Sequence, residues 1–242
     1  GQTSSVGCQS ARKVLNWLPN GQLAVRSAED LFLVESDGCA TVTAQDARRL
    51  FHLTYSPQGD RLAYIYRELV YDDEAVDYVP DSTLYVAEPT GRDSTEIVGD
   101  DYRARHLQFA PDGSELAFDV RSQEDTTRRQ IIIYELAADR LTYLIPPSAA
   151  GSESELHPHF SPSGDRVAYT VARESGRYAA VRNVGQTTML GEVEKAVWGW
   201  VGDQRIVVPG PGAHRVVDLT GETLLELPAT WSLVDVWHRL PS

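Results

Sequence analysis

Three histidines share one place in this sequence, three residues before an aromatic residue that opens a hairpin motif. They are His52, His106 and His157, and His159 adds a fourth imidazole close to the last of them. Neutral imidazoles that converge can bind a divalent transition metal. In the alternative, each imidazole caps a strand and forms a hydrogen bond to a neighbouring sheet. The spacing therefore predicts either a divalent metal site or a repeated structural contact.

The elements that must position these histidines come from a repeated motif. An aromatic residue is followed by a Pro step, a Gly and a short apolar strand, with a period of roughly 40 to 50 residues that is typical of repeat architectures. The copies open at Trp17, Tyr55, Phe109, Phe160 and, in degenerate form, Trp200. Pro presets the first turn position and Gly accepts a left-handed conformation, so each copy predicts an antiparallel hairpin.

Two further strands follow each hairpin, as at residues 84–87 and 96–98 of the second copy. Each copy therefore encodes a four-stranded antiparallel sheet. The strands are almost continuously apolar, which indicates that both faces of each sheet are covered. This pattern favours an all-β fold in which four-stranded sheets pack face to face as the blades of a β-propeller.

The motif Phe/Tyr-Ser-Pro-x-Gly-Asp/Ser-x-Leu/Val-Ala-Tyr/Phe resembles the TolB-type, or WD40-like (PD40), propeller repeat over about residues 12–222. The resemblance implies a propeller and often an extracytoplasmic bacterial location, periplasmic or secreted. It also implies that the repeated histidines lie near the mouth of the central channel. It does not imply one activity, because propellers serve as scaffolds, binding platforms and enzymes.

The repeats start near residues 12, 50, 104, 155 and 195, which favours five blades. We expect a closing strand over residues 231–238, and an incomplete sixth blade is the alternative. Residues 1–11 would form an N-terminal extension to a single propeller domain over residues 12–242.

Long connections interrupt the second and third repeats, over residues 67–82 and 119–130, and we expect both on the face opposite the Pro-Gly turns. They predict a face that binds a partner protein, through aromatic anchors with charged residues at the rim. The candidate residues are Tyr71, Asp72, Asp73, Glu74, Asp77, Tyr78, Arg121, Arg128 and Arg129. A solvated loop is the alternative for the acidic segment, and calcium a third, although the spacing does not match an EF-hand.

Composition excludes several function classes. The 242-residue chain has a net charge of −13, which argues against nucleic acid as a partner because phosphate neutralisation needs clustered Lys and Arg. No apolar run is long enough to predict a transmembrane segment. The chain lacks a Gly-x-Ser-x-Gly elbow, a P-loop, a dinucleotide fingerprint and a His-Glu-x-x-His motif, so we expect no cofactor.

The sequence favours a non-enzymatic protein-binding propeller, a scaffold or accessory subunit of an extracytoplasmic or membrane-associated complex.

A metal-dependent carbohydrate-active enzyme is the alternative function. The run His157-Pro158-His159 is similar to one in the oligogalacturonate lyases, propellers that hold a metal with histidines. Ser154 stands where that family would place an amide ligand.

Only two cysteines occur, Cys8 and Cys39. They predict either one disulfide, which would indicate an oxidising compartment, or two buried thiols.

Overall fold

The computed structural model describes some residues by their backbone alone and others together with their side chains. The backbone alone is described for residues 13–17, 23–26, 31–35, 38–41, 70–72 and 77–80. Side chains are also described for residues 49–69, 81–121, 127–146, 153–183, 185–210, 212–228 and 230. The predicted N-terminal extension and closing strand lie outside these residues. The chain divides into two compact units, Gly1–Gly113 and Ser114–Ser242.

The described elements are strands, apart from short 3-10 turns. The first sheet contains β1 (Lys13–Trp17), β2 (Leu23–Arg26), β3 (Leu31–Glu35) and β4 (Gly38–Thr41), and the second β5 (Leu50–Tyr55), β6 (Leu62–Asp72), β7 (Asp77–Ala87) and β8 (Thr95–Val98). The first unit also contains a 3-10 turn (Asp100–Tyr102) and the strand β9 (Arg105–Phe109). No helix among the described residues is long and apolar enough to cross a membrane.

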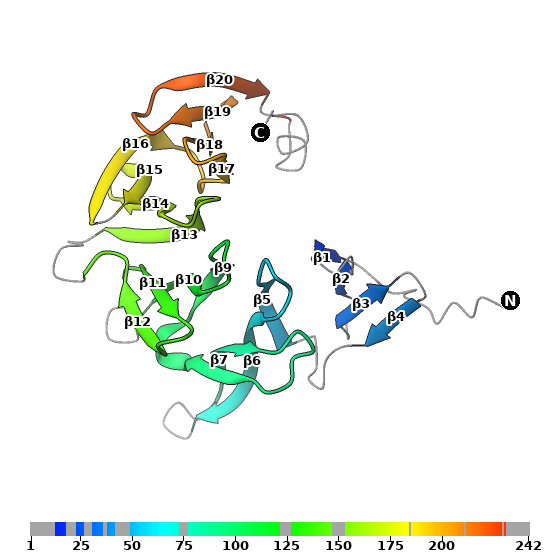
Figure 1. Ribbon diagram of the computed structural model, residues 1–242. Coiled ribbons are helices and arrows are strands. Elements are labelled where there is room, and N and C mark those ends of the chain that lie inside the picture. The colour runs from blue at the N-terminus through cyan, green and yellow to red at the C-terminus, as the bar shows by residue number, and fades with distance from the viewer. Residues whose placement is uncertain are drawn as a thin grey trace, which may run out of the picture. The chain divides into compact units, whose positions relative to one another are not determined.

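The second unit continues the same pattern. The third sheet has the order β12-β11-β10-β9 and adds β10 (Glu115–Val120), β11 (Gln130–Glu135) and β12 (Arg140–Tyr143). The fourth contains β13 (Ser154–Phe160), β14 (Arg166–Arg173), β15 (Gly176–Asn183) and β16 (Gln186–Val193), and the fifth β17 (Gly199–Val201), β18 (Arg205–Pro209), β19 (Ala213–Asp218) and β20 (Thr223–Pro228). Consecutive strands pair in each sheet (Figure 1). The all-β fold and the four-stranded antiparallel sheets are therefore confirmed.

Buried hydrogen bonds explain the Ser and Asp of the repeated motif. Gly59 has φ 73°, and its N–H donates to the Ser56 carbonyl oxygen at 2.9 Å, which closes the turn. The hydroxyl of Ser56, a residue only 1% exposed, donates to Asp60 Oδ1 at 2.8 Å and accepts the Arg61 N–H at 3.0 Å. A short polar side chain can thus be buried in the turn because both its donor and its acceptor are satisfied.

The fourth sheet repeats this arrangement. Ser161 donates to Asp165 Oδ1 at 3.0 Å and accepts the Arg166 N–H at 3.2 Å. The Ser-Pro form of the motif is therefore a self-contained turn in both the second and the fourth sheet. In the third copy Ala110 replaces the Ser, and the Gly113 N–H donates to the Ala110 carbonyl oxygen at 2.9 Å.

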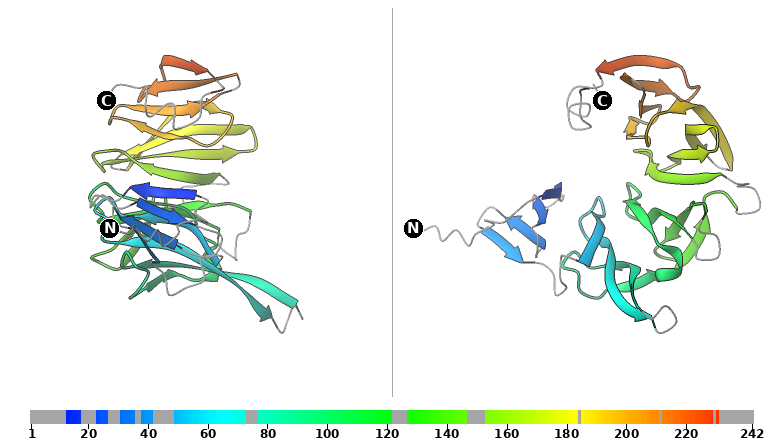
Figure 2. Two further views of the ribbon diagram at one scale, coloured as in Figure 1. Left: turned by 90° about the vertical axis from the view of Figure 1, so that its right-hand side faces the viewer. Right: turned by 180° about the vertical axis from the view of Figure 1, so that it is seen from behind.

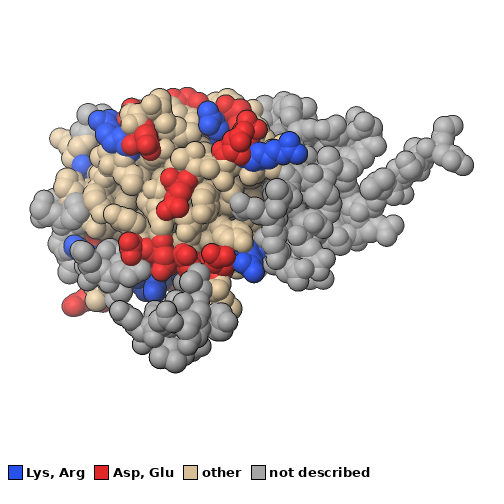
Figure 3. Space-filling model, turned by 90° about the horizontal axis from the view of Figure 1, so that it is seen from below, with Lys and Arg blue, Asp and Glu red and all other residues tan. Residues whose placement is uncertain are grey.

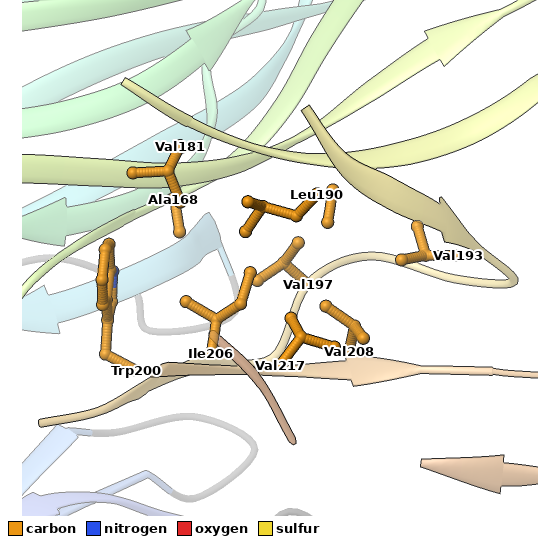
Figure 4. Close-up of a cluster of buried hydrophobic side chains, with 10 residues drawn as sticks. Ala168, Val181, Leu190, Val193, Val197, Trp200, Ile206, Val208 and Val217 are labelled. Carbon is orange, nitrogen blue, oxygen red and sulfur yellow. The ribbon is translucent and has the colours of Figure 1, made fainter. Parts of the chain in front are cut away.

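The hydrophobic core of the second unit lies between successive sheets. Figure 4 shows side chains of the fourth and fifth sheets packed against one another, among them Val181, Leu190, Trp200 and Ile206. The indole Nε1–H of Trp200 donates to the His159 carbonyl oxygen at 2.8 Å, which ties the innermost strands of these two sheets together. A second cluster of Ile131, Tyr169, Val171 and Ala180 joins the third and fourth sheets. Both faces of the fourth sheet are therefore covered, as its apolar strands predicted.

Candidate functional site

The long connection of the second sheet is a two-stranded ribbon. β6 and β7 pair in register from Leu62↔Ala87 to Asp72↔Asp77. β5 pairs with β6 only as far as Tyr66, and β8 pairs with β7 only as far as Leu84. Residues 67–72 and 77–82 therefore pair with each other alone and extend beyond their sheet, as the cyan and green strands show in Figure 2. The prediction that residues 67–82 only connect two strands was therefore wrong for most of this range, because β6 and β7 continue through it.

The register places residues of one kind opposite each other near the end of this ribbon. Tyr71 pairs with Tyr78, and Asp72 pairs with Asp77. Leu69, opposite Pro80, is 67% exposed, more than any other large hydrophobic residue whose exposure is described. Asp73 and Glu74 lie outside the described residues. The ribbon thus combines exposed apolar surface with aromatic and acidic positions.

The three arginines of the other long connection have different surroundings. Arg121 and Arg128 are half-buried, whereas Arg129 is only 7% exposed. The Arg129 guanidinium forms an ion pair with the carboxylate of Asp119, and its Nη2 donates to the Asp119 carbonyl oxygen at 2.9 Å. Arg129 was predicted to lie on the partner-binding face. Its side chain instead forms this buried ion pair and is not available at the surface.

Asp119 and Arg129 belong to a buried polar cluster that the sequence interpretation missed. Asp119 is 0% exposed, and its Oδ2 accepts the backbone N–H of His157 at 3.1 Å. The Arg129 N–H donates to the Ser154 hydroxyl oxygen at 3.1 Å. The cluster therefore connects the second and third strands of one sheet to the innermost strand of the next. The sequence did contain a signal for this cluster, namely the opposite charges of Asp119 and Arg129 near the two ends of the 119–130 connection.

Glu155 is the second buried carboxylate of this cluster and is 2% exposed. Its Oε2 accepts the Ile131 N–H at 3.2 Å, and its own N–H donates to the Arg129 carbonyl oxygen at 2.9 Å. Burial raises the pKa of Glu155 from 4.5 to about 7, because removal from water disfavours the charged form. This carboxyl group therefore titrates close to neutral pH.

The repeated histidines share an uncommon backbone conformation. The φ angles are 46° at His52, 53° at His106 and 55° at His157. The β5–β6 register shifts between Phe51 and Thr54, and the β13–β14 register shifts between Leu156 and His159. His is one of the few residues besides Gly that is enriched at positive φ. The innermost strands of the second and fourth sheets thus have a bulge at the histidine, and the positive φ that all three histidines share gives a backbone reason for the recurrence.

Two of the imidazoles are neighbours within the first unit. The ring centroids of His52 and His106 are 5.3 Å apart, with the rings inclined at 70°. His157 and His159 belong to the second unit. In the described part of the chain, no group of three or more His, Cys, Asp or Glu side chains is placed to hold a metal. A site formed by all four histidines stays a prediction.

The predicted disulfide also stays a prediction. Cys8 lies outside the described residues, and Cys39 is described only as part of the backbone of β4.

The chain has a net charge of −13. Figure 3 shows Asp and Glu side chains gathered in rows on one face, with Lys and Arg scattered beside them.

No protein-family model matches the chain, and neither does the sequence of any curated protein. Solved structures are similar to it. A TolB protein from Agrobacterium tumefaciens has a TM-score of 0.61 and 18% identity, over 89% of this chain and 81% of that one. TolB from Acinetobacter baumannii has a TM-score of 0.57 and 15% identity, over 88% of this chain and 53% of that one.

An oligogalacturonate lyase from Vibrio parahaemolyticus has a TM-score of 0.63 and 13% identity, over 87% of this chain and 63% of that one. At these identities the likeness concerns the fold alone.

Proposed function

We propose that this chain, which has the TolB-type β-propeller fold, is a non-enzymatic protein-binding propeller. It would act as a scaffold or accessory subunit of an extracytoplasmic or membrane-associated complex. In this proposal, residues 12–242 form one domain whose five four-stranded sheets are its blades. The location rests on the resemblance to TolB-type repeats. The observation that carries the function is the β6–β7 ribbon.

A two-stranded ribbon that extends beyond its sheet has little stability of its own unless other groups pack against it. An isolated two-stranded hairpin is marginally stable in water, and no third strand of the described residues pairs with the outer part of this one. Tyrosine provides a large contact area at a low cost in conformational entropy, and carboxylates at the rim select a basic partner. The Tyr71–Tyr78 pair would be the anchor, with Leu69 beside it and Asp72 and Asp77 at the rim. Arg121 and Arg128 would contribute to the same partner face.

Shortening the ribbon should abolish binding of the partner without unfolding the protein. Removing residues 71–78 and joining Val70 to Val79 through Asn-Gly keeps the register of the remaining hairpin, because these two residues are paired. We expect loss of specific partners in affinity capture from the membrane and envelope fraction, quantified by mass spectrometry. The midpoint of thermal unfolding should change little, since the removed residues pair only with each other.

The double variant Tyr71→Ser with Tyr78→Ser is the matched test, because it keeps the length and the charge of the ribbon. It should lose the same proteins as the shortened chain. Arg92→Gln, a surface change in the β7–β8 turn, should lose none. Undiminished capture by the shortened ribbon would show that the partner binds elsewhere.

A metal-dependent carbohydrate-active enzyme remains the second candidate. It is favoured by the run His157-Pro158-His159 and by the structural similarity to an oligogalacturonate lyase. In this reading, His52, His106, His157 and His159 would hold a divalent cation at the channel mouth. The bulges would hold the repeated histidines at one place in each inner strand.

Replacing His157 with Asn and His159 with Ala separates the two functions. Asn tolerates the positive φ of His157, so the backbone should keep its bulge while the imidazoles are lost. An enzyme of this kind should lose cleavage of oligogalacturonate and its bound metal in elemental analysis of tag-free protein. A non-enzymatic propeller should show neither activity nor metal before the change and should keep its partners after it.

A further inference from the structure

Three arginines line a small pocket at the base of the β6–β7 ribbon, in a protein that is otherwise strongly acidic. The pocket has a volume of about 160 Å³ and is lined by Arg67, Ser82, Arg103, Ala104 and Arg105. No carboxylate belongs to this lining. The volume suits one small anion with a few waters, since a water in the liquid takes up about 30 Å³.

Arg67 is held in a fixed orientation. Its guanidinium carbon lies 4.4 Å from the centroid of the Phe51 ring, and its Nε donates to the Ser82 hydroxyl oxygen at 3.1 Å. In the described part of the chain no carboxylate forms an ion pair with it. The two terminal nitrogens therefore remain for a ligand, and a planar guanidinium matches the geometry of a carboxylate or phosphate.

Ser82 adds a second donor. It is 8% exposed, and its hydroxyl oxygen accepts from Arg67, so its own hydrogen can be donated in another direction. Its backbone N–H donates to Asp100 Oδ1 at 3.3 Å, which fixes it against the 3-10 turn. Asp100 thus places one negative charge beside Ser82.

The backbone at Arg103 is strained. Arg103 follows the 3-10 turn with φ 41° and ψ 57°, and its N–H donates to the Asp100 carbonyl oxygen at 3.2 Å. A non-glycine residue in the left-handed region is strained and tends to occur at functional sites. Ala104 is buried, while Arg103 and Arg105 on either side of it are exposed and reach the same pocket.

We propose that this pocket is a binding site for a single oxyanion, a carboxylate or a phosphate group. Arg67 would bind it in a bidentate manner, Ser82 would donate one hydrogen bond, and Arg103 and Arg105 would neutralise its charge. The site is separate from the end of the ribbon and does not depend on whether the ribbon binds a partner.

The test uses the full chain labelled with ¹⁵N. Sodium acetate and inorganic phosphate are titrated separately at constant ionic strength, against sodium chloride, while the Nε–Hε signal of Arg67 and the amide of Ser82 are followed. We expect saturable shifts of both signals with at least one of the two oxyanions and none with chloride. Saturation by acetate would identify carboxylate as the ligand group, and saturation by phosphate alone would identify phosphate.

Matched variants distinguish a site from general charge attraction. Arg105→Gln removes one exposed charge of the lining and should raise the dissociation constant at least tenfold. Arg67→Lys keeps the charge but removes the planar fork, and it should do the same. Arg92→Gln makes an equal charge change outside the pocket and should leave the constant unaltered. Shifts that grow linearly with oxyanion concentration, or an equal effect of Arg92→Gln and Arg105→Gln, would overturn the proposal.

Discussion

Replacing Arg129 with alanine should lower the free energy of unfolding by about 3–5 kcal/mol, the range for breaking a buried ion pair. The reason lies in Asp119, which is 0% exposed and would be left buried without the guanidinium that compensates its charge. The change also removes the Nη2 hydrogen bond to the Asp119 carbonyl oxygen. Equilibrium unfolding in urea, followed by tryptophan fluorescence, measures the effect.

Arg140→Ala is the matched control. Arg140 also pairs with a carboxylate, that of Glu135, but the two side chains are 68% and 37% exposed. Water screens such a pair, so this variant should change the free energy of unfolding by less than about 1 kcal/mol. The double variant Arg129→Met with Asp119→Asn removes both charges and should be less destabilised than the sum of the single changes. Equal losses for Arg129→Ala and Arg140→Ala would contradict the buried pair.

Replacing Glu155 with Gln should change how stability depends on pH. The pKa of Glu155 is raised to about 7 in the folded protein from an ordinary value of 4.5. Between these values the folded state keeps a proton that the unfolded state has released. The contribution of Glu155 to the free energy of unfolding therefore falls as pH rises from about 4.5 to 7 and stays low above it.

The size of the effect follows from the shift. At about 1.4 kcal/mol for each pKa unit, the ionised carboxylate costs on the order of 3 kcal/mol above pH 7. Two arginines, Arg182 and Arg128, partly offset the burial, whereas Glu153 adds to it. Gln keeps an acceptor for the Ile131 N–H but carries no charge. The variant should thus be more stable than the original protein at pH 8 and nearly equal to it at pH 4.5.

Urea unfolding at pH 4.5, 6, 7 and 8 tests this expectation. Glu88→Gln, an exposed carboxylate in the first unit, should follow the curve of the original protein. An unchanged pH dependence for Glu155→Gln would show that Glu155 does not titrate in this range.

Much of the fold could be predicted from local chemistry. Pro57 and Gly59 specify a turn by their own backbone preferences, and Ser56 with Asp60 satisfies its polar groups within the turn. The second and fourth copies form the same hydrogen bonds among near neighbours in sequence, through Ser56 and Ser161, so the repetition indicates a turn that is specified locally. Strand pairing follows because a tight turn leaves the flanking apolar segments antiparallel.

The ribbon could not be predicted in the same way. Residues 67–82 are polar and acidic in part, which suggested a loop, yet β6 and β7 continue in register to Asp72 and Asp77. Pairing across such a segment depends on backbone hydrogen bonds to the opposite strand, which composition does not reveal. The exposed Leu69 is equally unremarkable in the sequence and becomes informative only once its surroundings are known.

The sequence by itself determined the repeat, the hairpin turns, the all-β class and the positions of the histidines along the inner strands. Only the tertiary structure decided that Arg129 is buried against Asp119, that Glu155 lies in the same cluster, and that Arg67, Arg103 and Arg105 line one pocket. The physical reason is the range of the interactions. Turns form between residues close along the chain, whereas burial, desolvation and the grouping of charges depend on which strands the fold brings together.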